Sequence, residues 1–169
     1  MSRILRPMPL TAEAFTAYGD VIEIAGAPDK VINQGMCGRH HDLAHLDFGT
    51  GKAGISLFDA KARSLPHTVD MVERHPEGSQ AFVPLDGVPM LIVVADDLAG
   101  HPVDLKAFIS GPGQSINLFR GTWHGVLAPL GKAGRYAVVD RIGAGTNLEE
   151  HWFPEPWIVE ASGPDSGPD

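Results

Sequence analysis

The sequence is poor in cysteine, in long apolar runs and in basic residues. Cys37 is the single cysteine among 169 residues, so no disulfide can form within the chain. That pattern fits a protein kept in a reducing compartment. The longest apolar run, Met90 to Ala95, is far shorter than the roughly 20 residues of a membrane helix, and the first residues lack an apolar stretch of signal-peptide length. We therefore expect a cytoplasmic protein.

The charge balance is acidic, with 13 Lys and Arg against 21 Asp and Glu and a net charge of −8. No run of basic residues forms a patch that could bind a polyanion. Such a chain repels nucleic acid and anionic membranes. A small anionic substrate is still compatible with this charge, because one local arginine can bind a carboxylate.

Glycine and proline are abundant, at 20 and 14 residues. This composition predicts many tight turns and short strands, which favours an all-β fold. About eight strand-like segments separated by Gly or Pro predict a jelly roll or small barrel. They are residues 54–61, 67–75, 80–85, 88–95, 106–110, 114–119, 123–127 and 135–142.

One short helix is expected before these strands. Thr11 is a suitable N-cap, Glu13 favours the first helical turn and Gly19 favours an end. The sequence therefore predicts a helix over Thr11–Tyr18.

Two other segments are assigned from turn chemistry and aromatic content. Asp86 and Gly87 form a strong hairpin turn pair, which predicts a hairpin of residues 80–85 and 88–95. Residues 148–160 contain three large aromatic side chains and are expected to close the barrel or to lie at an interface.

No internal repeat or linker divides the chain, so we expect a single domain over residues 1–160. Residues 161–169 consist of Ala, Ser, Gly, Pro and Asp. Because this composition offers almost no apolar surface to bury, we expect a flexible C-terminal tail.

The segment 67–75 carries the first candidate site residues. Alternate residues of a strand share a face, which places Glu73 and His75 at the end of a row that begins with Val69 and Met71. Burying a carboxylate and an imidazole without partners is costly. Their position therefore points to a functional site.

The turn after this segment adds two candidates. Pro76 and Gly78 fit a type I turn that can return Gln80 beside His75. Phe82 then shares a strand face with Gln80. We therefore place both side chains with the candidate site.

A further candidate follows a later glycine. Gly121 permits a sharp bend, and His124 begins the next strand. His75 and His124 are candidates for proton transfer, because imidazole titrates near neutral pH. A structural or surface role is expected for the other histidines whose neighbours suggest no site: His45, His67, His101 and His151.

These residues are similar to the two motifs of cupin barrels. The first cupin motif has two histidines around one residue, then a glutamate and a glycine, and the second has a glycine followed three residues later by a histidine. In this sequence Glu73 replaces the first histidine of the first motif, His75 matches the second histidine and Gln80 replaces the glutamate. Gly121 and His124 match the second motif. Because two positions differ, the usual cupin metal site is left open.

Longer stretches resemble one cupin family, the ureidoglycolate lyases. The resemblance follows the family's order and spacing over most of residues 9–142. The matching stretches are Leu10–Ile22, Ile32–Gly35, Arg39–Leu43, Glu73–Pro76, Gln80–Phe82, Trp123–His124 and Asp140–Arg141. This resemblance implies a cupin-like jelly-roll β-barrel, usually a homodimer. It also implies a carbon–nitrogen lyase of the amidine-lyase type, which splits ureidoglycolate into glyoxylate and urea during allantoin and purine breakdown.

The implied reaction needs a grip on the substrate carboxylate, a base for its hydroxyl proton and an acid for the departing urea nitrogen. We assign Glu73, His75 and His124 as catalytic, with Glu73 either orienting a histidine or acting as the base. Arg39 or Arg141 would bind the carboxylate bidentately. The substrate-binding candidates are Asn33 at the ureido group, Arg39, His41, Gln80 as a donor to a substrate oxygen, Phe82 and Arg141.

A metal-dependent version uses the same residues. Glu73, His75 and His124 form a two-histidine, one-carboxylate set that can hold a divalent ion such as nickel or zinc with open positions. Such an ion would bind the substrate hydroxyl and carboxylate and lower the hydroxyl pKa. The sequence leaves the metal-free and metal-dependent versions open.

Two other functions are compatible with the sequence. An amidohydrolase acting on the same substrate would release ammonia instead of urea. A non-catalytic cupin would bind a small molecule without turnover. The nitrogen product distinguishes these alternatives.

Overall fold

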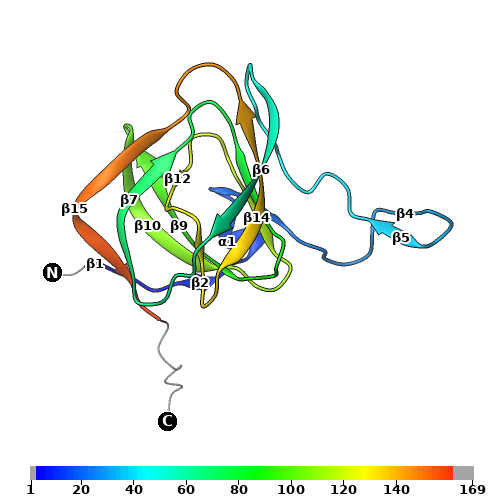
Figure 1. The fold of residues 1–169 in the computed structure, drawn as a ribbon, viewed down its shortest axis with the longest axis horizontal. Helices are drawn as coiled ribbons and strands as arrows, with labels where there is room; N and C mark the ends of the chain where they lie inside the picture. Colours follow the sequence, from blue (N-terminus) through cyan, green and yellow to red (C-terminus); the bar gives the residue numbers. More distant parts are fainter. Residues whose placement is uncertain (1–2, 162–169) are drawn as a thin grey trace, which may run out of the picture.

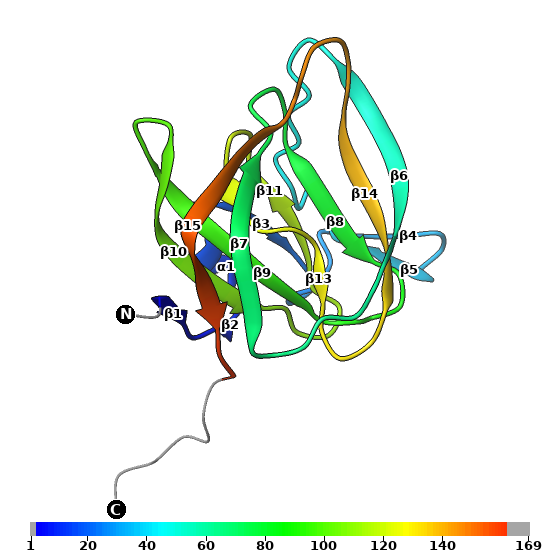
Figure 2. The ribbon, with the colours of Figure 1, turned by 60° about the vertical axis from the view of Figure 1, so that its left-hand side comes forward.

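Two β-sheets that face each other form the framework of the computed structural model, which describes residues 3–161 (Figures 1 and 2). One sheet has eight strands and the other has five, while two further strands form a separate hairpin. In chain order the elements are β1 (Arg3–Leu5), β2 (Met8–Pro9), α1 (Ala12–Phe15), β3 (Gly19–Ile22), β4 (Lys30–Ile32), β5 (Cys37–Arg39), β6 (Lys52–Ala60), β7 (His67–Arg74), β8 (Gln80–Pro84), β9 (Met90–Leu98), β10 (His101–Ile109), β11 (Ser115–Leu118), β12 (Trp123–His124), β13 (Ala128–Pro129), β14 (Gly134–Ile142) and β15 (Glu149–Val159).

The strand order defines a jelly roll. The five-stranded sheet contains the strand order β6-β14-β8-β11. The eight-stranded sheet contains the strand order β7-β12-β9-β10. The chain crosses between the sheets at most connections from β6 to β14, as in a double-sheet jelly roll of eight strands. The prediction of an all-β, cupin-like jelly-roll barrel with a short N-terminal helix is confirmed.

The core explains the longest apolar run of the sequence. On β9, Ile92 and Val94 face the core between the two sheets, which also contains Phe108 and Tyr136. The alternate residues of β9 pack instead with Trp123 and its neighbours on the other face of the curled eight-stranded sheet. Because β9 is covered on both faces, its sequence is continuously apolar instead of alternating.

The helix is shorter than the sequence predicts. Thr11 caps α1, with its hydroxyl accepting a hydrogen bond from the Ala14 amide at 3.2 Å. The chain then tightens, because the Tyr18 amide donates to the Phe15 carbonyl only three residues back. Gly19 does not end the helix but begins β3, where a Cβ would lie 2.0 Å from the Asn117 carbonyl oxygen. Glycine is needed there for close approach of two strands.

The hairpin predicted around Asp86 is wrong. β8 lies in the five-stranded sheet and β9 in the eight-stranded sheet, so the turn connects the two layers. The Asp86 carboxylate accepts hydrogen bonds from the Arg135 backbone and guanidinium at 2.8 to 3.2 Å, which tie the turn to β14. Turn chemistry predicted the bend correctly, but tertiary contacts decided where the two strands go.

The ends of the described chain add strands that the sequence analysis did not assign. β15 pairs with β7 and, in parallel, with β1, so the aromatic segment 148–160 closes the eight-stranded sheet. The first and last strands of the described residues are therefore neighbours in one sheet. Of the predicted tail 161–169, all but Ala161 lies outside the described residues. No helix among residues 3–161 is long and apolar enough to cross a membrane.

The β4–β5 hairpin stands away from the barrel (Figure 1). Its turn carries positive φ angles at Asn33, Gln34 and Gly35. Val31 and Met36 on this hairpin are 58% and 85% exposed. An isolated two-stranded hairpin is only marginally stable in water. The exposed apolar side chains of Val31 and Met36 therefore leave this hairpin without the apolar packing that would stabilise it.

Candidate active site

Glu73, His75 and His124 converge in the barrel. Glu73 on β7 and His124 on β12 are direct partners in the antiparallel register, and His75 follows the last residue of β7. One ligand atom from each of the three side chains lies within 4.8 Å of the others. The His75 Nε2 and Glu73 Oε1 atoms are 3.9 Å apart, and the two imidazole centroids are 5.2 Å apart.

Hydrogen bonds fix the tautomer of both histidines. His75 Nδ1 lies 2.7 Å from the Asn147 carbonyl oxygen, and His124 Nδ1 lies 3.0 Å from that of Gly125. Since a carbonyl oxygen only accepts, both Nδ1 atoms carry the proton and each neutral ring keeps a lone pair on Nε2. Both Nε2 atoms are buried and have no hydrogen-bond partner within residues 3–161.

Burial favours the neutral forms of Glu73 and His124. Burial raises the pKa of the Glu73 carboxyl, although His75 opposes this rise and Glu150 adds to it. Burial, with a smaller contribution from His75, lowers the pKa of His124 to about 4 despite its hydrogen bond to Gly125. His124 is therefore neutral at physiological pH. The cluster presents three lone-pair acceptors when Glu73 is ionised, a set that suits a divalent cation or a hydrogen-bond donor.

Gln80 and Phe82 lie on β8 beside the barrel interior. Phe82 and His124 line one small apolar pocket together with Ile116 and Leu118. Gln80 Nε2 donates to Asp140 Oδ2 at 3.3 Å, whereas its buried Oε1 has no partner among the described residues. We expected Gln80 to lie beside His75, but no hydrogen bond within residues 3–161 joins these two side chains.

Arg141 lies on β14, next to Asp140. Both Nη atoms of Arg141 donate to the Ala144 carbonyl, at 3.4 and 3.3 Å, and its buried Nε has no partner within the described chain. The guanidinium thus retains a buried Nε–H donor without a partner. No hydrogen bond or ion pair within residues 3–161 connects it to Glu73 or the two histidines.

The other predicted binding residues lie on or beside the β4–β5 hairpin. Asn33 is exposed at its turn. Arg39 Nη2 lies 2.8 Å from His41 Nδ1, and the His41 amide donates to Asp29 at 2.8 Å. Because the hairpin stands away from β7 and β12, a single chain does not bring these residues to the cluster (Figure 1).

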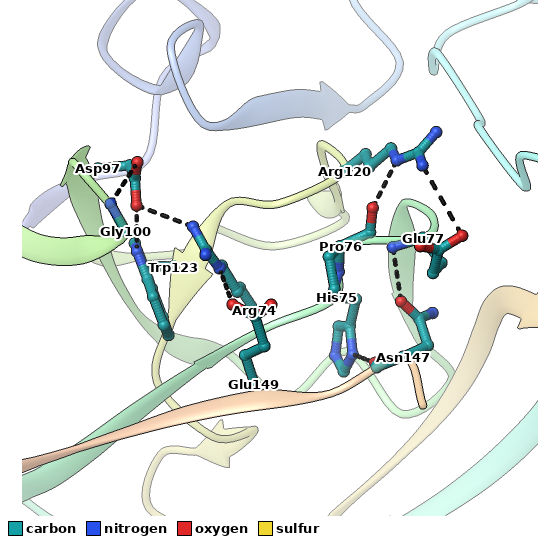
Figure 3. A network of polar contacts seen from close by, with 10 residues as sticks. All are labelled: Arg74, His75, Pro76, Glu77, Asp97, Gly100, Arg120, Trp123, Asn147 and Glu149. Carbon is teal, nitrogen blue, oxygen red and sulfur yellow. Dashed lines mark hydrogen bonds and ion pairs between the residues drawn. The ribbon is translucent and has the colours of Figure 1, made fainter. Parts of the chain in front are cut away.

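A second polar network, which the sequence analysis missed, is centred on Arg74, the neighbour of His75 in the chain (Figure 3). Arg74, between two cluster residues of the same segment, donates to Glu149 at 2.6 Å and to Asp97 at 2.8 Å. Its guanidinium carbon is 4.4 Å from the centroid of the Trp123 ring, and the indole also donates to Asp97 at 2.8 Å. These contacts tie together β7, β9, β12 and β15. The partners of Arg74 lie 23 and 75 residues away, so no local pattern could reveal them.

Comparisons with known proteins agree on one family. The family model described as ureidoglycolate lyase matches residues 2–160. The ureidoglycolate lyase of Rhodobacter capsulatus is 64% identical over 153 residues, which cover 90% of this chain and 95% of that protein. Ureidoglycolate lyase 2 of Rhizobium meliloti is 47% identical over 154 residues, covering 90% and 94%.

Among solved structures, RmlC from Streptococcus suis, in complex with dTDP-D-xylose, matches with a TM-score of 0.39 and 15% identity. That match covers 56% of this chain and 45% of RmlC. The resemblance inferred from the motifs is confirmed by the family model and the full-length relatives. The chain belongs to the ureidoglycolate lyase family.

Proposed function

We propose that this protein cleaves ureidoglycolate into glyoxylate and urea. The observation that carries the proposal is the convergence of Glu73, His75 and His124 in a chain whose full-length relatives are named for this activity. In the reaction the substrate hydroxyl loses its proton and its oxygen forms the carbonyl of glyoxylate. The carbon–nitrogen bond breaks, and the departing nitrogen of urea takes up a proton.

The side chains of the cluster differ in their fitness for proton transfer. A general acid or base works best when its pKa lies near the working pH. The lowered pKa of His124, about 4, makes its imidazole a weak base. Glu73, whose pKa is raised by burial, is better matched to take the hydroxyl proton and return it to the urea nitrogen. In this scheme His124 and His75 orient the substrate through their Nε2 atoms.

Glu73, His75 and His124 also fit a divalent transition metal, such as nickel or zinc. The support is chemical, since two unpartnered imidazole Nε2 atoms and a carboxylate face one another. Each histidine also donates a hydrogen bond from Nδ1–H to a backbone carbonyl, as metal-binding histidines commonly do. A bound ion would supply Lewis-acid polarisation of the substrate oxygens.

The substrate carboxylate requires a cation. Arg141 has an unpartnered, buried Nε on β14, whereas Arg39 stands on the exposed hairpin. Within one chain we therefore favour Arg141 for this role. Gln80, with a free Oε1, is suited to accept a hydrogen bond from the ureido nitrogen or the hydroxyl.

The product assay tests the proposed reaction. Chelator-treated protein is incubated with ureidoglycolate, and urea, glyoxylate and ammonia are measured before and after addition of nickel or zinc. We expect urea and glyoxylate in equal amounts and no ammonia. Ammonia would identify an amidohydrolase, and no product under any condition would identify a binding protein. Activity that appears only after the ion is restored would assign the cluster as metal ligands.

We further propose that two copies associate through the β4–β5 hairpin. The support is the exposure of Val31 and Met36 on a hairpin that makes little contact with its own barrel. Sedimentation velocity of the Val31→Asp, Met36→Asp double variant should show a monomer. The control Leu98→Asp, at a 65% exposed apolar residue on the barrel, should sediment like the wild-type dimer. A wild-type monomer would contradict the proposal.

We place the protein in the cytoplasm. The support is the single cysteine, which is exposed and unpaired. Exposed free thiols suit a reducing compartment.

A further inference from the structure

One loop residue, Asn147, accepts two hydrogen bonds from the turn that carries His75. Asn147 lies in the connection between β14 and β15, far in sequence from the turn that follows β7. Its carbonyl oxygen accepts the Nδ1–H of His75 at 2.7 Å. Its side-chain Oδ1 accepts the backbone N–H of Glu77, also at 2.7 Å (Figure 3).

The first bond determines which nitrogen of His75 faces the cluster. Within residues 3–161, the Asn147 carbonyl is the only hydrogen-bond partner of the His75 ring. The two tautomers of a free imidazole interconvert, and a hydrogen bond at one nitrogen selects between them. The carbonyl of Asn147 therefore holds the proton on Nδ1 and keeps the Nε2 lone pair towards Glu73 and His124.

The second bond holds that carbonyl in place. Residues 143–146 are exposed, whereas Asn147 is half-buried, and Gly145 has a positive φ of 86°. Apart from the long bonds of Arg141 to the Ala144 carbonyl, residues 143–146 make no side-chain hydrogen bond among the described residues that would fix the position of Asn147. The bond from Glu77 joins the Asn147 side chain to the same turn that carries His75, so the carbonyl and the imidazole keep their relative position.

We propose that Asn147 is a positioning residue, which acts on the reaction through His75. The inference deepens the proposed function and rests on it. The hydrogen-bond partners of Asn147, the His75 ring and the Glu77 amide, belong to one turn. Without the bond between the Asn147 side chain and Glu77, the Asn147 carbonyl is no longer held beside the His75 ring, and the ring can change its tautomer. Loss of a partner of this kind behind an active histidine commonly costs 10- to 100-fold in activity or metal affinity.

The nitrogen resonances of His75 report this role directly. The experiment compares ¹⁵N-labelled wild type, Asn147→Ala, Asn147→Asp and the control Thr146→Ala, with His75→Gln used to assign the signals. Thr146 is an exposed neighbour with no side-chain bond among the described residues. Asn147→Asp retains an oxygen that can accept from Glu77.

We expect the wild type, Asn147→Asp and Thr146→Ala to show a single Nδ1–H tautomer of His75. Asn147→Ala should show a mixture of tautomers and turn over about 10- to 100-fold more slowly. Should Asn147→Ala fail to fold, Asn147→Ser serves instead, because its hydroxyl is too short to reach the Glu77 amide from the same backbone position.

Three results would overturn the proposal. These are unchanged His75 resonances in Asn147→Ala, whatever its turnover; a mixture of His75 tautomers in Asn147→Ala with turnover at the wild-type level; and an Asn147→Asp variant that behaves like Asn147→Ala. The resonances are recorded without substrate. An inactive wild type would therefore reject the proposed reaction, while the tautomer of His75 would still decide the role of Asn147.

Discussion

Replacing His124 with asparagine is expected to lower turnover of ureidoglycolate by about 1,000-fold, within the usual range for loss of a group that orients the substrate or stabilises charge in the transition state. The Nδ2 of asparagine occupies nearly the place of the histidine Nδ1 and can still donate to the Gly125 carbonyl. The variant loses only the part of the ring that carries Nε2. That atom lies near Glu73 and His75 and has no hydrogen-bond partner within residues 3–161.

The matched control is His101→Asn, which changes an exposed histidine outside the cluster. Initial rates of glyoxylate release from both variants are compared with the wild type, and circular dichroism with urea denaturation monitors the fold. The control should keep full activity. An active His124→Asn enzyme, within a few-fold of wild type, would remove His124 from the site.

The second large effect is a loss of stability in acid that depends on His124. Burial lowers the pKa of this imidazole to about 4 in the folded state, against about 6.5 in an unfolded chain. Between these values the unfolded state binds more protons than the folded state. The free energy of unfolding therefore falls as the pH drops from about 6.5 to about 4. A difference of about 2.5 pH units corresponds to about 3 kcal/mol.

Denaturant titrations of chelator-treated wild type and His124→Asn, from about pH 7 down to about pH 4.5, measure this effect. The wild type should lose about 2 kcal/mol more than the variant over this interval, since most of the window between the two pKa values is crossed. Carboxylates with lowered pKa values, such as Asp20 and Asp97, are present in both proteins and cancel in the difference. Parallel loss of stability in the two proteins would show that His124 is not buried in its neutral form.

The strand pattern shows how much of the fold is predictable from local sequence. Glycine and proline between short apolar segments predicted an all-β jelly roll, and the segments around β6, β7, β8, β9, β11 and β14 were placed close to their observed bounds. The short strands of the first forty residues were missed, because two- to four-residue strands have too few positions to show alternation. The turn at Asp86 was predicted correctly, but the strands on its two sides belong to different sheets. The sequence of a turn does not determine whether its two strands pair with each other.

For the site, the sequence by itself determined the three residues that the structure brings together. Glu73 and His75 are near neighbours in the chain, and His124 follows a glycine in a recognisable motif, so spacing and residue type were sufficient to select them. The polarity of the segment around Arg39 and His41 was compatible with an exposed loop, but its distance from the barrel was not predictable, since motif similarity gives no distance between a loop and a barrel.

Only the tertiary structure decided how these residues are held. The tautomer of His75 depends on the Asn147 carbonyl, 72 residues away, and the neutral state of His124 depends on burial within the barrel. The Arg74 network likewise joins residues up to 75 positions apart. Hydrogen bonding and desolvation act between atoms that meet only after the sheets have formed, whereas the identity of a side chain and its local spacing are fixed in the sequence.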